Sequence, residues 1–333
     1  MDLDTKKIGV ILVAVLLAII IAGETISYAN PYYSNFDAER SGNEITYSID
    51  SNLSKDYTAV TMDNGGHYNI ERYVAFYDDE YFTPVKNALD SLKWLKHNLE
   101  KFNIDLIIAG IDEVKNVIEN IDITTALVFA TGTLPKEIYS GNNYDLIFDW
   151  LGAGGVMYWM DGRLGETYSE QGASKLVHVG SSKANMNFFD TDNLFRNDSN
   201  PVYNRDLVDN SLTYVLGIFF NECTHGLKTS GLVDYLSLDY SHEGYSAVTF
   251  VKYYNGSGMI CNLGGYLNHD TAHSVAQTIA SGLTYDSVVI DHHSGQISKD
   301  PNGKLQGVSG RTDLFIYIGK MSVIGGQYFQ LQP

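Results

Sequence analysis

The most apolar segment of the chain lies close to its first residue. Residues 8–22 read IGVILVAVLLAIIIA, without one polar side chain, and Lys6 and Lys7 stand directly before them. A helix in the core of a globular domain normally keeps a polar face, and this segment has none. Positive charge before an apolar segment holds the N-terminus in the cytoplasm while the remainder crosses the membrane. We therefore expect residues 1–29 to contact the lipid bilayer through 8–22 and to place the bulk of the chain outside the cell.

Two interpretations of this segment stay open at the level of the sequence. A signal peptide has an apolar core of this length, and SYA at 27–29 offers the small residues that cleavage needs. A membrane anchor usually needs about 20 apolar residues. The stretch 23–29 contains Ile26 as well as Glu24, which fits an uncleaved span with a snorkelling end. We favour an uncleaved single-pass anchor, and both interpretations leave everything after residue 30 outside the cytoplasm.

The outer part of the chain begins with a polar segment and continues as alternating strands and helices. Residues 30–55 are polar and have the composition of a stalk. Beyond them the pattern predicts strands at 57–62, 104–110, 125–131, 156–160 and 176–180, and helices from Thr83-Pro84 onward, at 112–120 and at 144–151. Apolar strands that alternate with amphipathic helices are typical of a parallel sheet covered on both faces. We predict an α/β fold with an open, mostly parallel sheet of the flavodoxin or Rossmann type over residues 56–284.

The later part of this domain contains an insertion and a hairpin. Residues 181–210 are rich in Asn and Asp and predict an insertion, which a helix at about 206–220 follows. Asn255-Gly256-Ser257 separates the apolar runs 246–254 and 258–265, and Asn-Gly between two such runs is a strong hairpin signal. A closing helix is expected at 270–282 and a small β appendix at 285–333.

Two segments carry a resemblance to a known family. LIFDWLGAGGVMYWMDGRLG (146–165) is a helix, a Gly-rich turn and a strand, and VTFVKYYNGSGMICNLGG (248–265) is a hairpin with a helix behind it. Over residues 57–283 the chain resembles class I glutamine amidotransferase-like domains, most of all the non-catalytic ones of β-galactosidase trimerisation domains and ThuA-like proteins. Active members place a nucleophilic Cys in a G-x-C-x-G elbow. Neither Cys223 nor Cys261 has that context, so the resemblance implies a domain without amidotransferase chemistry.

The charge and the residue composition of the chain limit the classes of molecule that it can bind. The formal net charge is −18, and Lys and Arg number 22 against 40 Asp and Glu. Neutralising phosphates needs an excess of cations, so nucleic acid is excluded as a partner. Three N-x-S/T sequons, at Asn52, Asn197 and Asn255, are glycosylation candidates and fit an extracellular glycoprotein. Cys223 and Cys261 form either one disulfide or two unbridged thiols.

Polar residues at the carboxyl ends of the predicted strands are candidates for a ligand site. In an open α/β sheet, ligands bind beyond these ends. The residues expected there are Asp63, Asn64 and His67 after the first predicted strand, Thr131 after the third, and Asp161 and Arg163 after the fourth. Carboxylates, an imidazole and a guanidinium on one rim can bind a polar ligand such as a sugar or peptide, although Asp and Asn in such places also simply form turns.

A second set of candidates is rich in histidine. His269 and His273 are four residues apart at the start of a predicted helix, and Asp291 and His292 follow about twenty residues later. Imidazole and carboxylate are suitable ligands for zinc and similar metals. HDTAH lacks the Glu of an H-E-x-x-H helix, and surface histidines that bind no metal are the commoner outcome for such residues.

Two functions follow as hypotheses. The first is a membrane-anchored binding or scaffolding protein of the cell envelope, whose partners are the bilayer and a cell-wall glycan or envelope protein, and which uses no cofactor. The second is an extracytoplasmic hydrolase of cell-wall glycan or peptide, with Asp63, His67 and Asp161 in its site. Glycoside cleavage would need two carboxyl groups about 5–10 Å apart.

Overall fold

The computed structural model describes part of the chain. The backbone is described for residues 35–41, 44–50, 59–63, 70–192, 202–203, 207–208, 222–223, 225–241, 245–280, 282–285, 288–291, 295–299 and 305–306, and side chains for 70–192, 225–236, 245–280 and 282–285. The predicted membrane segment at 8–22 lies outside these ranges. Within them, no helix combines the length and the apolar character that a bilayer crossing requires.

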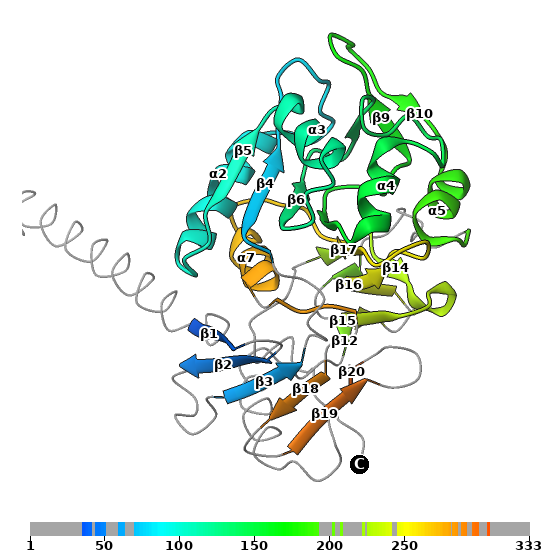
Figure 1. Cartoon of the computed structure of the whole chain (residues 1–333). Coiled ribbons are helices and arrows are strands. Elements are labelled where there is room, and N and C mark those ends of the chain that lie inside the picture. Colours follow the sequence, from blue (N-terminus) through cyan, green and yellow to red (C-terminus); the bar gives the residue numbers. More distant parts are fainter. Residues whose placement is uncertain are drawn as a thin grey trace, which may run out of the picture.

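The centre of the molecule is a mixed α/β unit built on a nine-stranded sheet (Figure 1). Its strands run in the order β12 (Leu207–Val208), β15 (Tyr235–Ser241), β16 (Tyr245–Lys252), β17 (Met259–Leu263), β8 (Val156–Trp159), β6 (Thr125–Phe129), β4 (Arg72–Phe76) and β5 (Leu106–Ala109), and β14 (Leu227–Lys228) pairs with β16. The five strands from β17 to β5 pair in parallel, whereas β12, β15 and β16 add antiparallel pairs at one side. The prediction of an α/β fold with a mostly parallel central sheet is confirmed.

Helices cover both faces of the parallel strands, as their apolar stripes dictate. One face carries α2 (Ala88–Glu100) and α7 (Ala272–Ala280), whose side chains form one core cluster with the sheet. The other face carries α3 (Ile111–Glu119), α4 (Leu146–Ala153) and α5 (Ser181–Phe189), which form the second cluster. Every residue of β6 is buried, because this strand lies inside the sheet with helices on both sides. The continuous apolar run at 125–129 is the sequence signature of that position.

Several predicted elements are confirmed within a few residues of their expected ends. They are the strands β5, β6 and β8, the helices α3, α4 and α7, and the hairpin of β16 and β17. The hairpin turn packs on the turn between α4 and β8, because Ser257 N–H donates to Gly152 O at 3.2 Å and Met259 N–H to Gly155 O at 2.9 Å. The two segments that carried the family resemblance therefore lie against each other.

Three local predictions differ from the structure. The helix from Thr83-Pro84 onward begins only at Ala88, because Asn87 adopts a left-handed backbone (φ 57°) and interrupts it. The strand predicted at 176–180 is a two-residue strand, β10 (Val177–His178), in a separate three-stranded sheet with β9 (Thr167–Ser169) and β7 (Leu134–Pro135). The insertion predicted at 181–210 opens with α5, whose buried Phe188 and Phe189 join the second core cluster.

A second sheet combines segments from the two ends of the chain. It has the order β1 (Asn35–Ser41), β2 (Glu44–Asp50), β3 (Ala59–Asp63), β18 (Val288–Asp291), β19 (Gly295–Lys299) and β20 (Leu305–Gln306). The expected stalk at 30–55 thus contains two paired strands, and the C-terminal strands are joined to β3 rather than forming a separate appendix. The remaining short pair is β11 (Val202–Tyr203) with β13 (Glu222–Cys223), where a helix had been expected nearby at 206–220. Residues 209–221 lie outside the described ranges.

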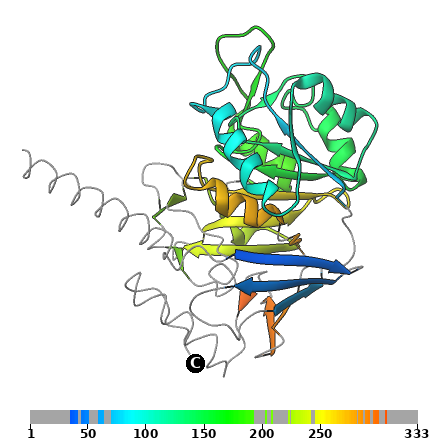
Figure 2. The same ribbon diagram turned by 90° about the vertical axis from the view of Figure 1, so that its left-hand side faces the viewer.

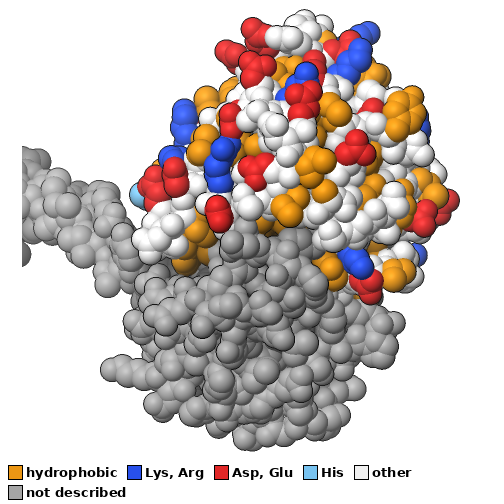
Figure 3. All heavy atoms as spheres, viewed as in Figure 1, with side chains coloured by type: hydrophobic (Ala, Val, Ile, Leu, Met, Phe, Trp, Pro, Cys, Tyr) orange, Lys and Arg blue, Asp and Glu red, His pale blue; other side chains and the backbone are white. Residues whose placement is uncertain are grey.

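The six-stranded sheet lies at one end of the molecule in both ribbon views, next to β15 of the nine-stranded sheet (Figures 1 and 2). The arrow of β4 points away from the six-stranded sheet, so the loops at its carboxyl end are the part farthest from that sheet (Figures 1 and 2). On the face seen in Figure 3, acidic and basic side chains are interspersed over α2 and α3, without a patch of one sign. On this face, charged side chains therefore do not distinguish one end of the α/β unit from the other. The two ends differ in their loops.

Candidate functional site

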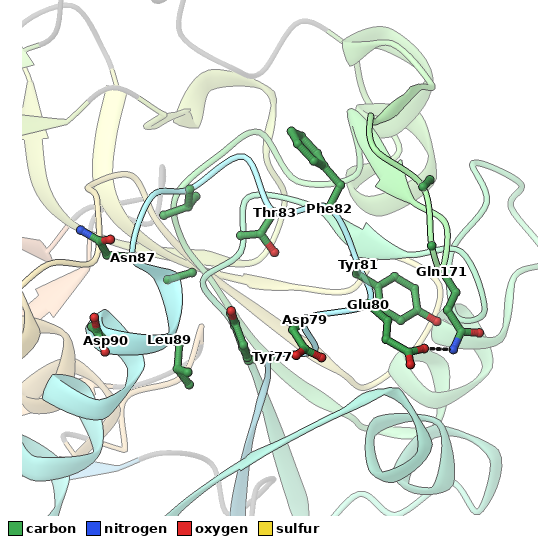
Figure 4. A pocket seen from close by; sticks show the side chains of 14 residues that line it. Tyr77, Asp79, Glu80, Tyr81, Phe82, Thr83, Asn87, Leu89, Asp90 and Gln171 are labelled. Atoms are coloured by element: carbon green, nitrogen blue, oxygen red, sulfur yellow. Dashed lines mark hydrogen bonds between the residues drawn. The ribbon is translucent and has the colours of Figure 1, made fainter.

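An open cleft of about 1080 Å³ lies beyond the carboxyl end of β4. We call it the β4–α2 cleft, because most of its wall is the segment between these two elements. Its lining residues are Tyr77, Asp79, Glu80, Tyr81, Phe82, Thr83, Val85, Asn87, Ala88, Leu89, Asp90, Gln171, Gly172 and Ala173. In Figure 4, Asn87, Leu89 and Asp90 stand on the α2 side, and Glu80, Tyr81 and Gln171 on the opposite side.

Backbone contacts hold the wall segment in place on both sides. The Asp78 carboxylate accepts the N–H of Glu80 at 3.0 Å and the N–H of Ile111, the first residue of α3, at 3.3 Å. On the other side, Gly172 N–H donates to Glu80 O at 2.8 Å, and the side chains of Glu80 and Gln171 are hydrogen-bonded (Figure 4). The cleft is therefore a preformed feature of the loop rather than an accidental gap beside it.

The cleft is lined by carboxylates and aromatic rings. Asp79, Glu80 and Asp90 are its charged residues, and Lys93 pairs with Asp90 at 3.0 Å. Tyr77 and Phe82 add aromatic surface, and 41% of the Phe82 side chain is exposed at the rim. Acidic groups next to aromatic faces suit a ligand with several donors or a positive charge.

Tyr81 is the most deeply buried polar residue of the cleft wall. It is 4% exposed, and its hydroxyl donates a hydrogen bond to the neighbouring Glu137 carboxylate. Burial raises the pKa of Tyr81 above its ordinary value, and the nearby Glu137 carboxylate raises it further. The hydroxyl is therefore protonated at physiological pH and stands in a negative field.

Asp161 lies behind this wall, at the end of β8. Its Oδ1 accepts the N–H of Leu267 at 2.7 Å, which ties β8 to the turn before α7, and its Oδ2 has no hydrogen-bond partner. A Cβ on Gly132 would stand 2.7 Å from the Asp161 carbonyl oxygen and 3.1 Å from the Val85 side chain, so the loops after β6 and β8 touch here. Burial raises the pKa of Asp161 well above its usual range, and only the Leu267 N–H opposes this.

Replacing Asp161 by Asn is expected to change how stability depends on pH. The folded-state pKa lies above the unfolded value of 3.8, so the favourable contribution of the protonated acid is complete below that value and is lost as the pH rises through the folded-state pKa. Asn cannot ionise and keeps the acceptor for Leu267. The free energy of unfolding of the variant relative to the parent should therefore increase from about pH 4 upward, by at most about 1.4 kcal/mol per pH unit. Thermal melts at a series of pH values measure this, and parallel curves would show that Asp161 is not held protonated.

The residues predicted for the strand ends are only partly brought together. Thr131 is fully buried, and its hydroxyl donates a hydrogen bond to Thr133 O at 2.9 Å. Nη1 of Arg163 lies 3.5 Å from Oε1 of Glu166. These two and Asp161 follow the adjacent strands β6 and β8, but none of them lines the cleft. Asp63 ends β3, which belongs to the six-stranded sheet, so it was assigned to the wrong sheet. Asn64 and His67 lie outside the described residues.

The predicted metal ligands are not gathered in the part of the chain that is described, which holds no group of three His, Cys, Asp or Glu residues able to bind a metal. The exposed His269 contacts Trp94 edge-on, at 4.4 Å between ring centroids. His273 lies beside Phe102, and burial, followed by the charge of Lys101, lowers its pKa to about 4. Asp291 ends β18, and His292 lies outside the described residues.

The structure also places some of the cysteines and glycosylation candidates identified in the sequence. Cys261 is fully buried in β17 as an unbridged thiol, and burial raises its pKa well above the ordinary value, so it is unsuited to nucleophilic chemistry. Cys223 is placed in β13, although its side chain is not described. Asn255 is exposed in the β16–β17 turn, where a glycan could be attached. Asn52 and Asn197 lie outside the described residues.

Sequence reasoning missed the cleft because it missed β4. The run YVAF at 73–76 is short, and the acidic and aromatic residues after it look like an ordinary turn before a helix. The available signal was a buried apolar run followed at once by YDDEYF at 77–82, a dense mixture of carboxylates and rings.

Comparisons with known proteins add little. No family model matches the chain, and no curated protein matches it. Among solved structures, the exo-β-1,4-mannosidase Op5Man5 from Opitutaceae bacterium strain TAV5 aligns with 64% of this chain and 33% of its own, at 11% identity and a TM-score of 0.36. The match thus spans about a third of the length of that enzyme, and a superposition this loose establishes neither a shared fold nor a shared activity.

Proposed function

We propose that the protein is a membrane-anchored binding or scaffolding protein of the cell envelope, whose ligand occupies the β4–α2 cleft. The observation that carries the proposal is the cleft itself, a preformed hollow of about 1080 Å³ lined by carboxylates and aromatic rings. Clefts of roughly this size accommodate small organic ligands. A cell-wall glycan or an envelope peptide would present such a ligand.

The order of the strands supports the position of the site. Taken in chain order, β4, β5, β6, β8 and β17 stand in the sheet as 2-1-3-4-5, the order of flavodoxin-like folds. In that order β5 lies on one side of β4, and the chain then returns to place β6 on the other side of β4. Ligands of such folds bind beyond the carboxyl ends of the strands at this reversal. The cleft lies at the carboxyl end of β4, one of the two strands beside this reversal. We retain a non-catalytic amidotransferase-like domain as the proposed family, since the buried thiol of Cys261 cannot act as its nucleophile.

The position of the predicted membrane anchor supports a site that faces away from the bilayer. Residues 23–34 separate the predicted anchor from β1, and twelve residues reach at most about 40 Å. The six-stranded sheet that contains β1 would therefore lie near the bilayer. The carboxyl end of β4 points away from this sheet (Figures 1 and 2), so the cleft would open toward the extracellular side.

The alternative function is an extracytoplasmic hydrolase of cell-wall glycan or peptide. One observation favours it: the cleft holds more than one carboxylate, and glycoside cleavage uses two. The residues first expected for this activity do not carry it, because Asp161 is buried behind the wall and Asp63 ends a strand of the other sheet. Asp79 and Glu80 would have to take their place.

A binding assay tests the proposal. The full-length protein in detergent is titrated with glycan and peptide fragments solubilised from the cell envelope of the source organism. Phe82→Ala, which removes the ring at the cleft rim, should weaken binding about tenfold, the loss of one well-packed aromatic contact. Tyr144→Ala removes a ring that is 78% exposed and outside the cleft, and should bind as the parent does.

The outcomes separate the two functions. Equal binding by the parent and both variants would show that the cleft is not the site. Release of shortened fragments by the parent, abolished by Asp79→Asn, would establish the hydrolase instead.

A further inference from the structure

Asp161 is a buried carboxyl group with one oxygen atom that lacks a partner. It is 5% exposed, and its Oδ1 accepts the N–H of Leu267 at 2.7 Å. Its Oδ2 has no hydrogen-bond partner among the described residues. Because Oδ1 faces a donor, the proton of the acid form belongs on Oδ2, where it meets no acceptor. Unsatisfied buried polar groups are rare in folded proteins, and each calls for a structural or functional reason.

The backbone of Asp161 is unusual as well. Its φ is 65°, in the left-handed region that residues with a side chain seldom adopt. The turn is held by Trp159, whose indole N–H donates to Gly162 O at 2.6 Å. Uncommon backbone of this kind persists only where its surroundings hold it, and it gathers at ligand-binding and switching sites. The strain and the unsatisfied oxygen thus coincide in one residue.

Asp161 lies where loops from three other strands meet. A Cβ on Gly132, after β6, would stand 2.7 Å from Asp161 O. The same Cβ would stand 3.2 Å from Cγ of Pro84 and 3.1 Å from Cγ2 of Val85, which follow β4. Val85 also lines the β4–α2 cleft, and Leu267 follows β17. Contacts between loops open at a lower free-energy cost than the core of a sheet does, so a disturbance at Asp161 is relieved here first.

The charged groups around Asp161 do not compensate it. The segments 83–87, 131–133, 160–165 and 264–270 meet here, and their other titratable side chains are Lys86, Arg163, Tyr266, His269 and Asp270. All of these are exposed except Arg163, which is paired with Glu166. Burial raises the pKa of Asp161 well above its usual range, and only the Leu267 N–H lowers it. An ionised Asp161 therefore has no positive partner among the described residues and depends on water for its stabilisation.

We propose that Asp161 is a pH-sensitive switch, which keeps the loops at the carboxyl ends of the strands together when it is protonated and lets them separate when it ionises. A carboxylate without a positive partner is far more stable in water than in a buried position. The Leu267 N–H favours the charged form, so the contacts with Gly132 and Val85 are the ones that give way. The cleft then deepens toward β8. The switch needs no ligand, and it goes beyond the proposed function.

The sign of the pH dependence follows from the burial of the acid. The pKa of Asp161 in the folded protein lies above the ordinary 3.8. The loops are therefore closed at low pH and open as the pH rises through the folded-state value. Above that value, the ratio of open to closed molecules grows by at most about tenfold per pH unit, because one proton is released.

Acrylamide quenching of Trp159 fluorescence, measured on the full-length protein in detergent, tests the inference. Trp159 is fully buried and hydrogen-bonded to Gly162, so it reports whether the loop after β8 opens. All samples carry Trp94→Phe, because an exposed indole that contacts the His269 imidazole would add a pH dependence of its own. Trp150, the third Trp of the chain, is buried at the amino ends of the strands and contributes equally throughout.

In this background the quenching constant should rise severalfold from about pH 4 to about pH 9, along the titration of one proton. Adding Asp161→Asn, which cannot ionise and keeps an acceptor for Leu267, should abolish the rise. If Asn is not tolerated in the fold, Asp161→Gly serves the same purpose, since Gly readily adopts a φ of 65°. Quenching that stays constant with pH in the background, or that rises equally without the Asp161 carboxyl, would overturn the inference.

Asp79→Asn is the matched control. It removes an exposed carboxylate of the cleft and leaves Asp161 in place. The rise in quenching should persist in this variant, and its loss would assign the pH dependence to the cleft surface and overturn the inference as well. Thermal melts at each pH confirm that every sample is folded, so that quenching reports local opening and not unfolding.

Discussion

Replacing Gly258 by Ala is expected to destabilise the protein by about 3 kcal/mol, the upper range for overpacking a rigid contact. A Cβ at this position would stand 2.1 Å from the carbonyl oxygen of Leu151 and 2.7 Å from that of Gly155. Both atoms belong to backbone that is already fixed by hydrogen bonds between the β16–β17 turn and the α4–β8 turn. Neither side can move without breaking the close approach, so the hairpin must separate from α4.

The measurement is a thermal melt of Gly258→Ala, compared with that of an alanine variant at a second glycine of the same contact. Gly152 is also at this contact, but a Cβ there would meet only Asn255 O, at 3.7 Å, an ordinary distance. Gly152 lies within α4, where Ala is favoured by about 0.5–1 kcal/mol. Gly152→Ala should therefore melt at or above the parent temperature and Gly258→Ala well below it. Equal melting of the two variants would show that the turns do not touch as described.

Removing residues 2–29 is expected to release the protein from membranes altogether. The segment 8–22 is the most apolar of the chain and has lysines before it, and one such span binds far more tightly than surface charge could. The full chain should sediment with membranes after a high-salt wash, and the truncated chain should stay in the supernatant. Extraction of the full chain by salt alone would contradict the anchor. A mature chain that begins at Asn30 would keep the extracytoplasmic location and refute only the anchor.

The central sheet could be predicted where burial leaves a mark on the sequence. TALVF at 125–129 and VMYW at 156–159 are apolar at nearly every position because helices cover both faces of their strands. The hairpin at Asn255-Gly256 could be predicted for a different reason, since its turn chemistry is local.

The pairing of strands could not be predicted in the same way. YTAVTM at 57–62 and RYVAF at 72–76 are similarly rich in β-forming residues. Only their partners distinguish them: β3 pairs with β18 from the far end of the chain, and β4 with β5 and β6. Because the first of the two runs was taken for the first strand of the parallel sheet, the candidate rim was displaced to Asp63.

The cleft shares this dependence on distant partners. Glu80 meets Gln171 across 91 positions of sequence, and this contact closes one side of the cleft. No local pattern around either residue encodes the other. The strand ends after β6 and β8 were identified correctly, but Thr131 and Asp161 are turned inward there, where burial holds them as supports rather than as ligand-binding groups.

The most direct test of the proposed function asks whether the cleft opens outside the cell. Phe82→Cys places a thiol at the exposed rim, and the parent protein gives the background from Cys223 and the buried Cys261. Intact cells that express the full-length variant are treated with a membrane-impermeant maleimide, with and without the envelope fragments used in the binding assay, at a concentration raised about tenfold to offset the loss of the Phe82 ring. We expect labelling of the variant above background in intact cells and its reduction by the fragments. Labelling that occurs only after the cells are lysed would overturn the proposed function.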